Sequence, residues 1–304
     1  MKVLVVTNCA TAAYTEGLRA LFPEWDVKGA DLAATRKFIR ERNQAFLDHM
    51  ASSAMLVASL PDDPMFDTFA ADGTKLFIPN FLFRAYHPDS FYLHTGGAAS
   101  HAMDDGTDTP TAREGGRRQA RLHSRITVTA FLLGMSAEET AAAFNGRTYE
   151  KIGYFSVFES ERDKLLGRFG QAGIDLAPEL ERWTESGDFL YTFNHPKAVV
   201  FSDILLKALT GRFIAPAGIA AAGETLAQVP DFLAGSPRWP VYPEIAARLG
   251  FEGSLLWRTG RGAGGRSLPL AEFIAESFAS LSGAAGFTAD DVPGFADCAA
   301  ALRS

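Results

Sequence analysis

Three short aliphatic runs, at 3–6, 55–58 and 76–78, constrain the fold of this chain more than any other feature. Each run is continuous in apolar residues and ends at turn-forming residues, which is typical of strands buried on both faces. Apolar residues at helical spacing over 12–21 and 33–50 separate the first two runs. Strands that alternate with helices predict an α/β fold with an open, mostly parallel sheet flanked by helices. Ligands of such sheets bind at the carboxyl ends of the strands.

The rest of the sequence indicates a change of organisation after the first part of the sheet. We expect residues 1–100 to form the first part of an α/β sheet domain. A polar, loop-like segment at 98–116 leads into a mainly helical insertion over 101–185. Residues 186–304 are expected to return to the sheet domain and to add the carboxyl-terminal helices.

Composition and charge exclude several classes of protein. The 304 residues carry 29 Lys and Arg against 36 Asp and Glu, a net charge of −7, whereas a general nucleic-acid binder carries a basic excess. No apolar run approaches the ~18–20 residues of a membrane span. The opening apolar run is too short for a signal peptide, so we expect a cytoplasmic protein. The sequence has no CxxC and no HxxxH pattern, so no metal site is expected.

Cys9 is the most informative single position. It lies in the turn between the first predicted strand and the first predicted helix. The positive end of that helix would stabilise a thiolate and lower the pKa from about 8.5 into a range of about 3.5–7.5. A nucleophile and a small buried hydrophobic side chain are both compatible with the position. The second cysteine, Cys298, lies in an Ala-rich segment and is interpreted as structural or incidental.

His195 is the main candidate for a catalytic base. It follows a predicted strand at 189–192 and precedes Pro196, which we expect at the first position of a helix through Leu209. A helix amino terminus keeps an imidazole neutral and able to accept a proton. A cysteine with such a histidine makes the nucleophile–base pair of acyl transfer. A capping or core histidine is the alternative.

Two further polar residues follow the predicted strands. Asn80 could donate a hydrogen bond to an oxyanion, although Pro-Asn is also ordinary turn chemistry. His87 is a second candidate base, with Asp89 two residues later to orient it. The same residues could instead form a turn around Pro88.

Two basic clusters stand out in this acidic chain. The first has arginines at a four-residue spacing, which predicts one helical stripe, and the second is a Gly-rich loop from Arg258 to Arg266. Arginine and exposed backbone N–H groups bind phosphate, so either cluster could hold a phosphorylated cofactor. A solvated helix face and a surface loop are the alternatives. Neither cluster has the spacing of a P-loop or of a dinucleotide-binding GxGxxG motif. The first cluster consists of Arg113, Arg117, Arg118, Arg121, His123 and Arg125.

Several short motifs, in their order and spacing, resemble those of the WcbI family of polysaccharide-biosynthesis enzymes. The likeness extends over roughly residues 1–260. The family's first motif usually reads Gly-Asn-Cys-Gln, and this chain has Thr7 and Ala10 at its two ends. The motifs are Thr7-Asn8-Cys9, Ile78-Pro79-Asn80, Tyr86-His87-Pro88-Asp89, Phe193-Asn194-His195-Pro196 and Trp239-Pro240-Val241-Tyr242-Pro243.

The resemblance implies a fold related to SGNH-type esterases and a coenzyme A-dependent O-acetyltransferase. Its substrate would be a surface polysaccharide, such as a capsule, or a sugar precursor. The resemblance implies Cys9 as nucleophile and His195 as base, with Asn80 and His87 as further catalytic-site residues. The acyl donor, acetyl-CoA, is expected to contact Asn8, Ala10, Thr11, Arg117, Arg121, Arg258 and Arg261.

Two alternatives stay open at this point. A cysteine-dependent esterase or thioesterase would use the same residues with water as the acceptor. A catalytically inactive CoA- or glycan-binding protein would bind its ligand without turnover. The expected partners are a small-molecule acyl donor and a carbohydrate acceptor, with no nucleic acid and no membrane span, and a homo-oligomer is compatible with the sequence.

Overall fold

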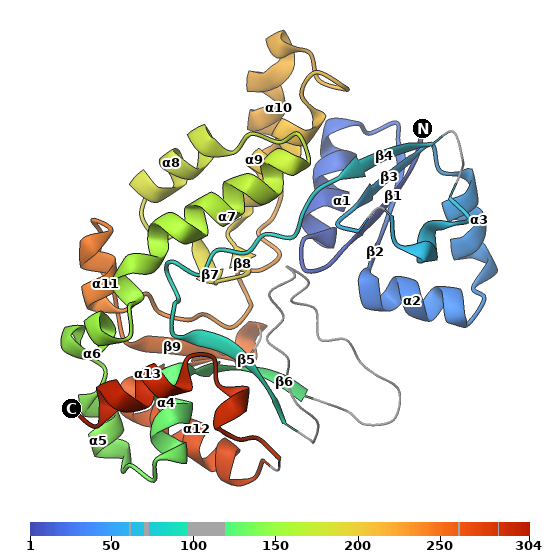
Figure 1. The fold of residues 1–304 in the computed structure, drawn as a ribbon. Coiled ribbons are helices and arrows are strands. Elements are labelled where there is room, and N and C mark those ends of the chain that lie inside the picture. Colours follow the sequence, from blue (N-terminus) through green and yellow to red (C-terminus); the bar gives the residue numbers. More distant parts are fainter. Residues whose placement is uncertain (61, 70–72, 96–118, 261, 285) are drawn as a thin grey trace. The chain divides into compact units, whose positions relative to one another are not determined.

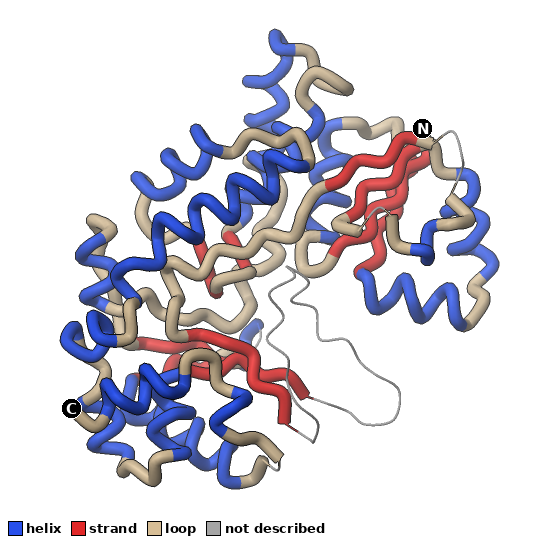
Figure 2. Tube along the Cα trace, in the orientation of Figure 1, coloured by secondary structure: helices blue, strands red, loops and turns tan. Residues whose placement is uncertain are grey.

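The chain divides into two compact units, each built from separate stretches of sequence. Figure 2 distinguishes the helices, strands and loops of the chain by colour. The computed structural model describes residues 1–60, 62–69, 73–95, 119–260, 262–284 and 286–304. The sheet unit comprises Met1–Phe81, Asp163–Phe189 and Asn194–Ala234. The hairpin unit comprises Leu82–Arg162, Leu190–Phe193 and Gly235–Ser304. The domain boundaries expected at 101 and 186 stay a prediction.

A parallel four-stranded sheet forms the centre of the sheet unit (Figure 1). Its strands lie in the order β2-β1-β3-β4, and every pairing is parallel. The predicted α/β fold with an open parallel sheet is therefore confirmed. The chain leaves β1 toward β2 and returns to β3 on the other side, so the topological switch point lies between β1 and β3. The strands are β1 (Lys2–Thr7), β2 (Asp26–Asp31), β3 (Met55–Ala58) and β4 (Thr74–Phe77).

Helices cover both faces of this sheet. Helix α1 (Thr11–Leu21) lies on one face, and α2 (Leu32–Arg40) and α3 (Gln44–Ser52) lie on the other (Figure 1). Side chains of β1 and β3 alternate between the two faces. On the face of α2 and α3 they form an apolar cluster that includes Leu4, Val6, Leu32, Met50, Leu56 and Ala58.

Helix α1 also packs against α9 (Ala198–Leu209) and α10 (Ile219–Leu226). Gly17 permits this close approach, because a Cβ there would lie 2.6 Å from Cδ2 of Leu205 and 3.1 Å from Cδ2 of Leu226. The sheet unit is completed by η1 (Pro64–Phe66), α8 (Ala177–Glu185), β8 (His195–Pro196) and η3 (Pro216–Gly218).

The single helix predicted over 33–50 is wrong, because the chain breaks between α2 and α3. Arg42 has a φ of 52°, a left-handed conformation that does not continue a right-handed helix. Asn43 then caps α3, and its Oδ1 accepts a hydrogen bond from the Phe46 N–H at 3.0 Å. Apolar spacing continues through this break because both helices bury residues against the same face of the sheet.

Two antiparallel strand pairs give the hairpin unit its name. β5 (Ser90–Thr95) pairs with β6 (Gln119–Ser124), and β9 (Leu256–Thr259) pairs with β10 (Arg266–Pro269). Helix α7 (Val157–Gln171) begins in this unit and ends in the sheet unit. The remaining elements are β7 (Leu190–Thr192), α4 (Arg125–Leu132), α5 (Ala137–Ala142), α6 (Gly146–Lys151), η2 (Tyr154–Ser156), α11 (Pro243–Arg248), η4 (Gly262–Gly264), α12 (Leu270–Ser282), η5 (Ala289–Asp291) and α13 (Phe295–Leu302).

The helical stripe predicted for the first basic cluster is wrong at Arg121, so Arg121 and Arg125 do not share a helix. Arg121 lies in β6, opposite Leu93 of β5. The helix begins only at Arg125, because the Ser124 side chain caps it by accepting from the Thr127 N–H at 3.0 Å. The other arginines, Arg113, Arg117 and Arg118, lie outside the described residues.

The Gly-rich loop predicted from Arg258 to Arg266 is shorter than expected, because its two ends are strand residues. Arg258 and Arg266 belong to paired strands, in which Arg258 lies opposite Ser267 and Arg266 opposite Thr259. The turn of this β-hairpin contains Gly260, Gly262, Gly264 and Gly265. The backbone pairing of its two strands fixes Arg258 and Arg266. Arg261 lies outside the described residues.

Gly253→Ala should destabilise the hairpin unit. A Cβ at Gly253 would lie 2.6 Å from the Val241 carbonyl oxygen and 2.7 Å from Cα of Pro243, and backbone atoms do not move aside as a flexible side chain does. We expect the free energy of unfolding to fall by about 1–3 kcal/mol. Gly167→Ala is the control, because the added Cβ of this α7 residue meets no atom within 4 Å and should stabilise by up to ~1 kcal/mol. Urea denaturation compares the two, and a Gly253→Ala protein as stable as wild type would contradict this packing.

Candidate active site

The carboxyl ends of β1 and β3 meet at the switch point of the sheet. Val6 is the register partner of Ala58, and the Ser59 N–H continues the ladder by donating to the Val6 carbonyl at 3.3 Å. The β1–α1 turn, which carries Cys9, starts directly beyond this point. The sheet therefore places Cys9 where open α/β sheets bind their ligands.

Hydroxyl groups hold the β1–α1 turn in place. The Thr11 hydroxyl donates to the Asn8 carbonyl at 2.8 Å, which leaves its oxygen to accept from the buried Thr7 hydroxyl at 2.9 Å. The Thr11 N–H also donates to the Asn8 carbonyl, at 3.2 Å. These bonds tie both sides of Cys9 to the end of β1. Thr7, which departs from the family motif, has a structural role in this turn.

The structure brings Cys9 next to Asn194, 185 residues away in the sequence. The half-buried thiol donates toward the Asn194 carbonyl at a sulfur–oxygen distance of 3.6 Å, and the Asn8 Oδ1 lies 3.4 Å from the same sulfur. Both residues belong to the sheet unit. The residue after Asn194 is His195, which is half-buried and whose Nδ1 is buried. The contact was not predicted because it joins segments that are distant in the chain.

The prediction that Cys9 is a thiolate is wrong for the protein without a ligand. Burial raises the pKa of the Cys9 thiol to about 12, and a hydrogen bond from its own backbone N–H lowers it only in part. Burial raises the pKa of Tyr14 in α1, and a negative charge on Cys9 would raise it further. The two side chains are therefore within electrostatic reach of each other. At neutral pH the thiol is protonated. Desolvation outweighs the helix terminus because the charged form loses its water.

The helix expected to begin at Pro196 begins at Ala198 instead. Pro196 pairs in the short strand β8, and Lys197 is the residue that precedes the helix. The Ala198 N–H donates to Asp231 Oδ2 at 3.0 Å, so an acidic side chain occupies the positive end of α9. His195 is therefore a strand residue beside Asn194 rather than the cap of a helix.

Asn80 lies beyond the carboxyl end of β4 in the same unit as Cys9. It is half-buried, and its backbone carbonyl accepts a hydrogen bond from Arg168 Nη1 at 3.4 Å. β3 separates β4 from β1 in the sheet. The prediction that Asn80 serves the site stays a prediction, with Arg168 as the cation beside it.

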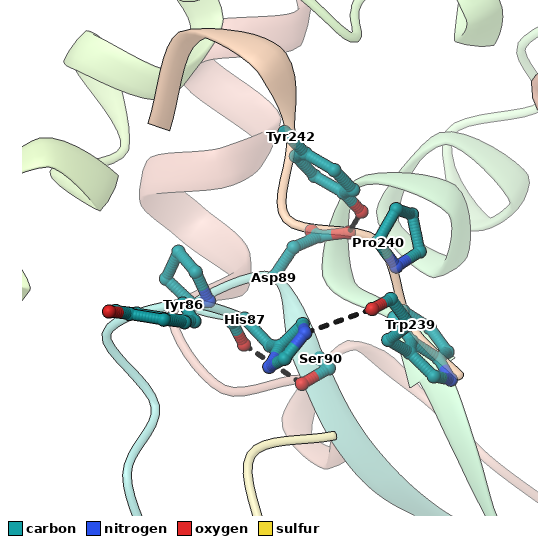
Figure 3. Close-up of a pocket in the computed structure, with 8 residues that line it drawn as sticks. Tyr86, His87, Asp89, Ser90, Trp239, Pro240 and Tyr242 are labelled. Atoms are coloured by element: carbon teal, nitrogen blue, oxygen red, sulfur yellow. Dashed lines mark hydrogen bonds between the residues drawn. The ribbon is translucent and has the colours of Figure 1, made fainter. Parts of the chain in front are cut away.

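His87 and Asp89 belong to the hairpin unit and are joined there to a distant motif (Figure 3). The buried His87 Nε2 lies 3.0 Å from the Trp239 carbonyl, and because a carbonyl only accepts, this nitrogen carries a proton. The Tyr242 hydroxyl donates to Asp89 Oδ2 at 2.5 Å. Two of the motifs that carried the resemblance, more than 150 residues apart, thus pack together.

The Asp89 carboxylate binds two tyrosines. Besides Tyr242, the Tyr154 hydroxyl donates to Oδ1 at 2.6 Å and the Ile126 N–H to the same oxygen at 3.0 Å. Burial, and then the Asp89 charge, raise the pKa of both tyrosines well above their usual value, so both stay donors. The space between these side chains does not admit even a water molecule, whereas small-molecule sites have volumes of ~300–1,000 Å³. We interpret this cluster as a polar core.

The basic residues expected at phosphate groups are distant from the β1–α1 turn in the sequence. The described ones, Arg121 and Arg258, belong to the hairpin unit. Arg258 Nη2 donates to the Gly262 carbonyl at 2.9 Å, within its own hairpin. Arg121 Nη1 lies 3.5 Å from the Ser280 hydroxyl. The neighbouring His123 is not a cation, because burial and then the Arg121 charge lower its pKa to about 4. Arg117 and Arg261 lie outside the described residues.

Residues 2–210 match the model of a family described as polysaccharide biosynthesis enzyme WcbI. The chain belongs to this family. The matched segment contains Cys9, Asn80, His87 and His195, and it ends before β9 and β10. The WcbI family is one of enzymes of polysaccharide biosynthesis.

A solved structure with a similar fold is described as WcbI, a novel polysaccharide biosynthesis enzyme, as the native protein without a disulfide bond between CoA and one of its cysteines. That protein is 13% identical, the TM-score is 0.54, and the match covers 99% of this chain and 97% of that one. At this identity the likeness shows the fold alone. No curated protein matches the chain.

Within the described ranges, none of the helices combines the length and apolar character that crossing a membrane requires. The same part of the chain contains no cluster of three or more His, Cys, Asp and Glu side chains arranged to hold a metal ion.

Alkylation of Cys9 should be slow and should rise with pH without a plateau below pH 9. Only the thiolate reacts, and a thiol with a raised pKa is almost fully protonated there. We expect iodoacetamide to modify Cys9 at least ~10²-fold more slowly at pH 8.5 than a small free thiol. The Cys298→Ala variant removes the other cysteine, and intact mass measures the rate. Fast labelling that levels off near pH 7 would show that Cys9 is a thiolate.

Proposed function

We propose that this WcbI-family chain transfers an acetyl group from acetyl-CoA to a hydroxyl group of a surface polysaccharide or its sugar precursor. The observation that carries the proposal is the 3.6 Å contact of the Cys9 thiol with the carbonyl of Asn194, the residue before His195. It supports the proposal because it brings the segment that carries His195 next to the Cys9 thiol at the switch point. Family membership supports the polysaccharide, and the description of the similar structure, which names CoA, supports the donor.

In the first half-reaction, Cys9 Sγ attacks the acyl carbon of the donor. The raised pKa of the thiol means that no thiolate is ready beforehand, so His195 takes the thiol proton as the S–C bond forms. The carbonyl electron pair moves onto the acyl oxygen. When this pair returns, the bond to the leaving sulfur breaks, and His195 gives its proton to that sulfur. The acetyl group then resides on Cys9.

In the second half-reaction, His195 takes the proton of the acceptor hydroxyl as the oxygen attacks the acetyl carbon. The bond to Cys9 Sγ breaks, and His195 returns the proton to the sulfur. The enzyme ends in its starting state, and the sugar carries an acetate ester. In the direct route, which the proposal also allows, His195 activates the sugar hydroxyl against the donor without an acetylated Cys9. Water in place of the sugar would make the same residues a thioesterase.

The other predicted site residues have proposed roles around this pair. Asn8, Ala10 and Thr11 line the β1–α1 turn beside the donor, and α1 adds its uncapped amino terminus, since Ala10 has no side-chain acceptor. Asn80 is proposed to line the site. We propose the arginines for the phosphate groups of CoA, as their planar donors suit phosphate: Arg117, Arg121, Arg258 and Arg261.

Incubation with acetyl-CoA alone should acetylate Cys9, because the first half-reaction needs no sugar. Intact mass should show one added acetyl group on wild type and on Cys298→Ala, the control for the other cysteine. Cys9→Ala should show none and should lower acetyl release by at least about 10³-fold. His195→Ala should lower the rate by about 10²–10⁴-fold. Full activity in both Cys9→Ala and His195→Ala would refute the Cys/His site, while acetate as the product with every sugar tested would indicate the thioesterase.

Calorimetric titration should show binding of CoA with a Kd near 1 μM, about −8 kcal/mol. Dephospho-CoA should bind more weakly, because it lacks the 3′-phosphate that arginine would hold, and a hydrogen bond to a charged group contributes about 1.5–3 kcal/mol. Arg258→Ala tests a described arginine of the second cluster and should reduce this difference between the two ligands. Absence of binding by either ligand would refute CoA as donor, and equal affinity would refute the phosphate contact.

A further inference from the structure

Ser59 is a buried hydroxyl group without a hydrogen-bond partner among the described residues. Its residue is 3% exposed, and its Oγ is buried with no donor or acceptor within reach. Ser59 follows β3, and its N–H still pairs with the Val6 carbonyl of β1. The hydroxyl therefore lies at the carboxyl edge of the sheet, on the strand adjacent to the one that leads to Cys9.

The alternation of β3 gives the face on which the Ser59 side chain lies. Leu56 and Ala58 pack into the apolar cluster with α2 and α3, so the next side chain points to the opposite face. That is the face covered by α1, and Thr7 occupies the equivalent position on β1, where its hydroxyl meets Thr11 of α1 at 2.9 Å. Ser59 thus shares one face and one edge with the turn that presents Cys9.

A buried hydroxyl without a partner is unfavourable in the free protein. The sheet unit contains further such hydroxyls, Thr15 Oγ1 in α1 and Thr35 Oγ1 in α2, on residues that are 6% and 0% exposed. Thr15 Oγ1 lies against Gly29 of β2, and Thr35 follows β2, which lies on the side of β1 opposite to β3. Position therefore distinguishes Ser59 from these two threonines: Ser59 lies at the switch point, where a bound substrate could supply the missing partner.

We propose that Ser59 is a further catalytic residue, whose hydroxyl donates a hydrogen bond to the acyl oxygen of a thioester substrate. The inference rests on the proposed function. As Cys9 Sγ attacks, the carbonyl electron pair moves onto the acyl oxygen, and the Ser59 O–H stabilises that charge while keeping its own proton. The hydrogen bond strengthens as the oxygen gains charge, so it acts on the transition state more than on the bound substrate.

The test compares Ser59→Ala with Thr35→Val, since each removes one unpartnered buried hydroxyl. Both should keep or raise Tm, by up to a few degrees, because an unsatisfied group is lost. Only Ser59→Ala should lower kcat for thiol release from acetyl-CoA in water, by about 10²-fold, the effect of one oxyanion donor, with a smaller change in KM. Unchanged kcat in Ser59→Ala, or a fall in its Tm, would overturn the inference, the latter because it would reveal a structural partner.

The Cys9→Ala variant separates this inference from the proposed function. If Cys9→Ala still turns over acetyl-CoA at the wild-type rate, the proposed function fails whatever Ser59 does. If Cys9→Ala is inactive and Ser59→Ala is fully active, the proposed function stands and the role of Ser59 alone is refuted. An equal loss of kcat in Thr35→Val would also refute it, because the effect would then follow from removal of any buried hydroxyl.

Discussion

The burial of β1 is the constraint on which the site depends. Its backbone is paired on both edges, with Val5 opposite Gly29 on one side and Val57 on the other, and its five residues after Lys2 are buried. A buried strand cannot shift without leaving N–H and C=O groups unpaired, which costs free energy. The end of β1 is therefore fixed in space, and the turn to Cys9 begins from a fixed point.

The same burial decides the chemistry available to Cys9. Enough protein surrounds the thiol to raise its pKa to about 12, so the neutral group persists at physiological pH. A stored thiolate would react with any electrophile, whereas a protonated thiol needs a base at the moment of attack. The contact with Asn194 brings the segment of His195 to the sulfur. In the proposed mechanism, reactivity therefore depends on two distant segments being held together, which would link catalysis to the integrity of the sheet unit.

The local sequence pattern predicted the strands and the turn that depend on neighbouring residues. It missed the helix ends and strand pairings that depend on residues distant in the sequence. The continuous runs at 3–6 and 55–58 predicted β1 and β3, and the Cys9 turn followed from them. The break at Arg42, the pairing of Arg121 with Leu93 and the start of α9 at Ala198 depend on a cap or a partner strand that periodicity does not report. The pKa of Cys9 was predicted in the wrong direction because a helix terminus is visible in sequence and desolvation is not.

Short motifs of one family can therefore have different physical roles, and hydrogen bonding separates them. The Asp89 carboxylate is saturated by Tyr154, Tyr242 and the Ile126 N–H, so binding a substrate there would break bonds that the fold already makes. Ser59 has the opposite character, since its buried oxygen has no partner in the described part of the chain. A group that the fold has already satisfied gains little from a ligand, whereas one that it has left unsatisfied gains a full hydrogen bond. This criterion favours the edge of β1 and β3 as the place of the proposed reacting oxygen and assigns the Asp89 cluster to the core.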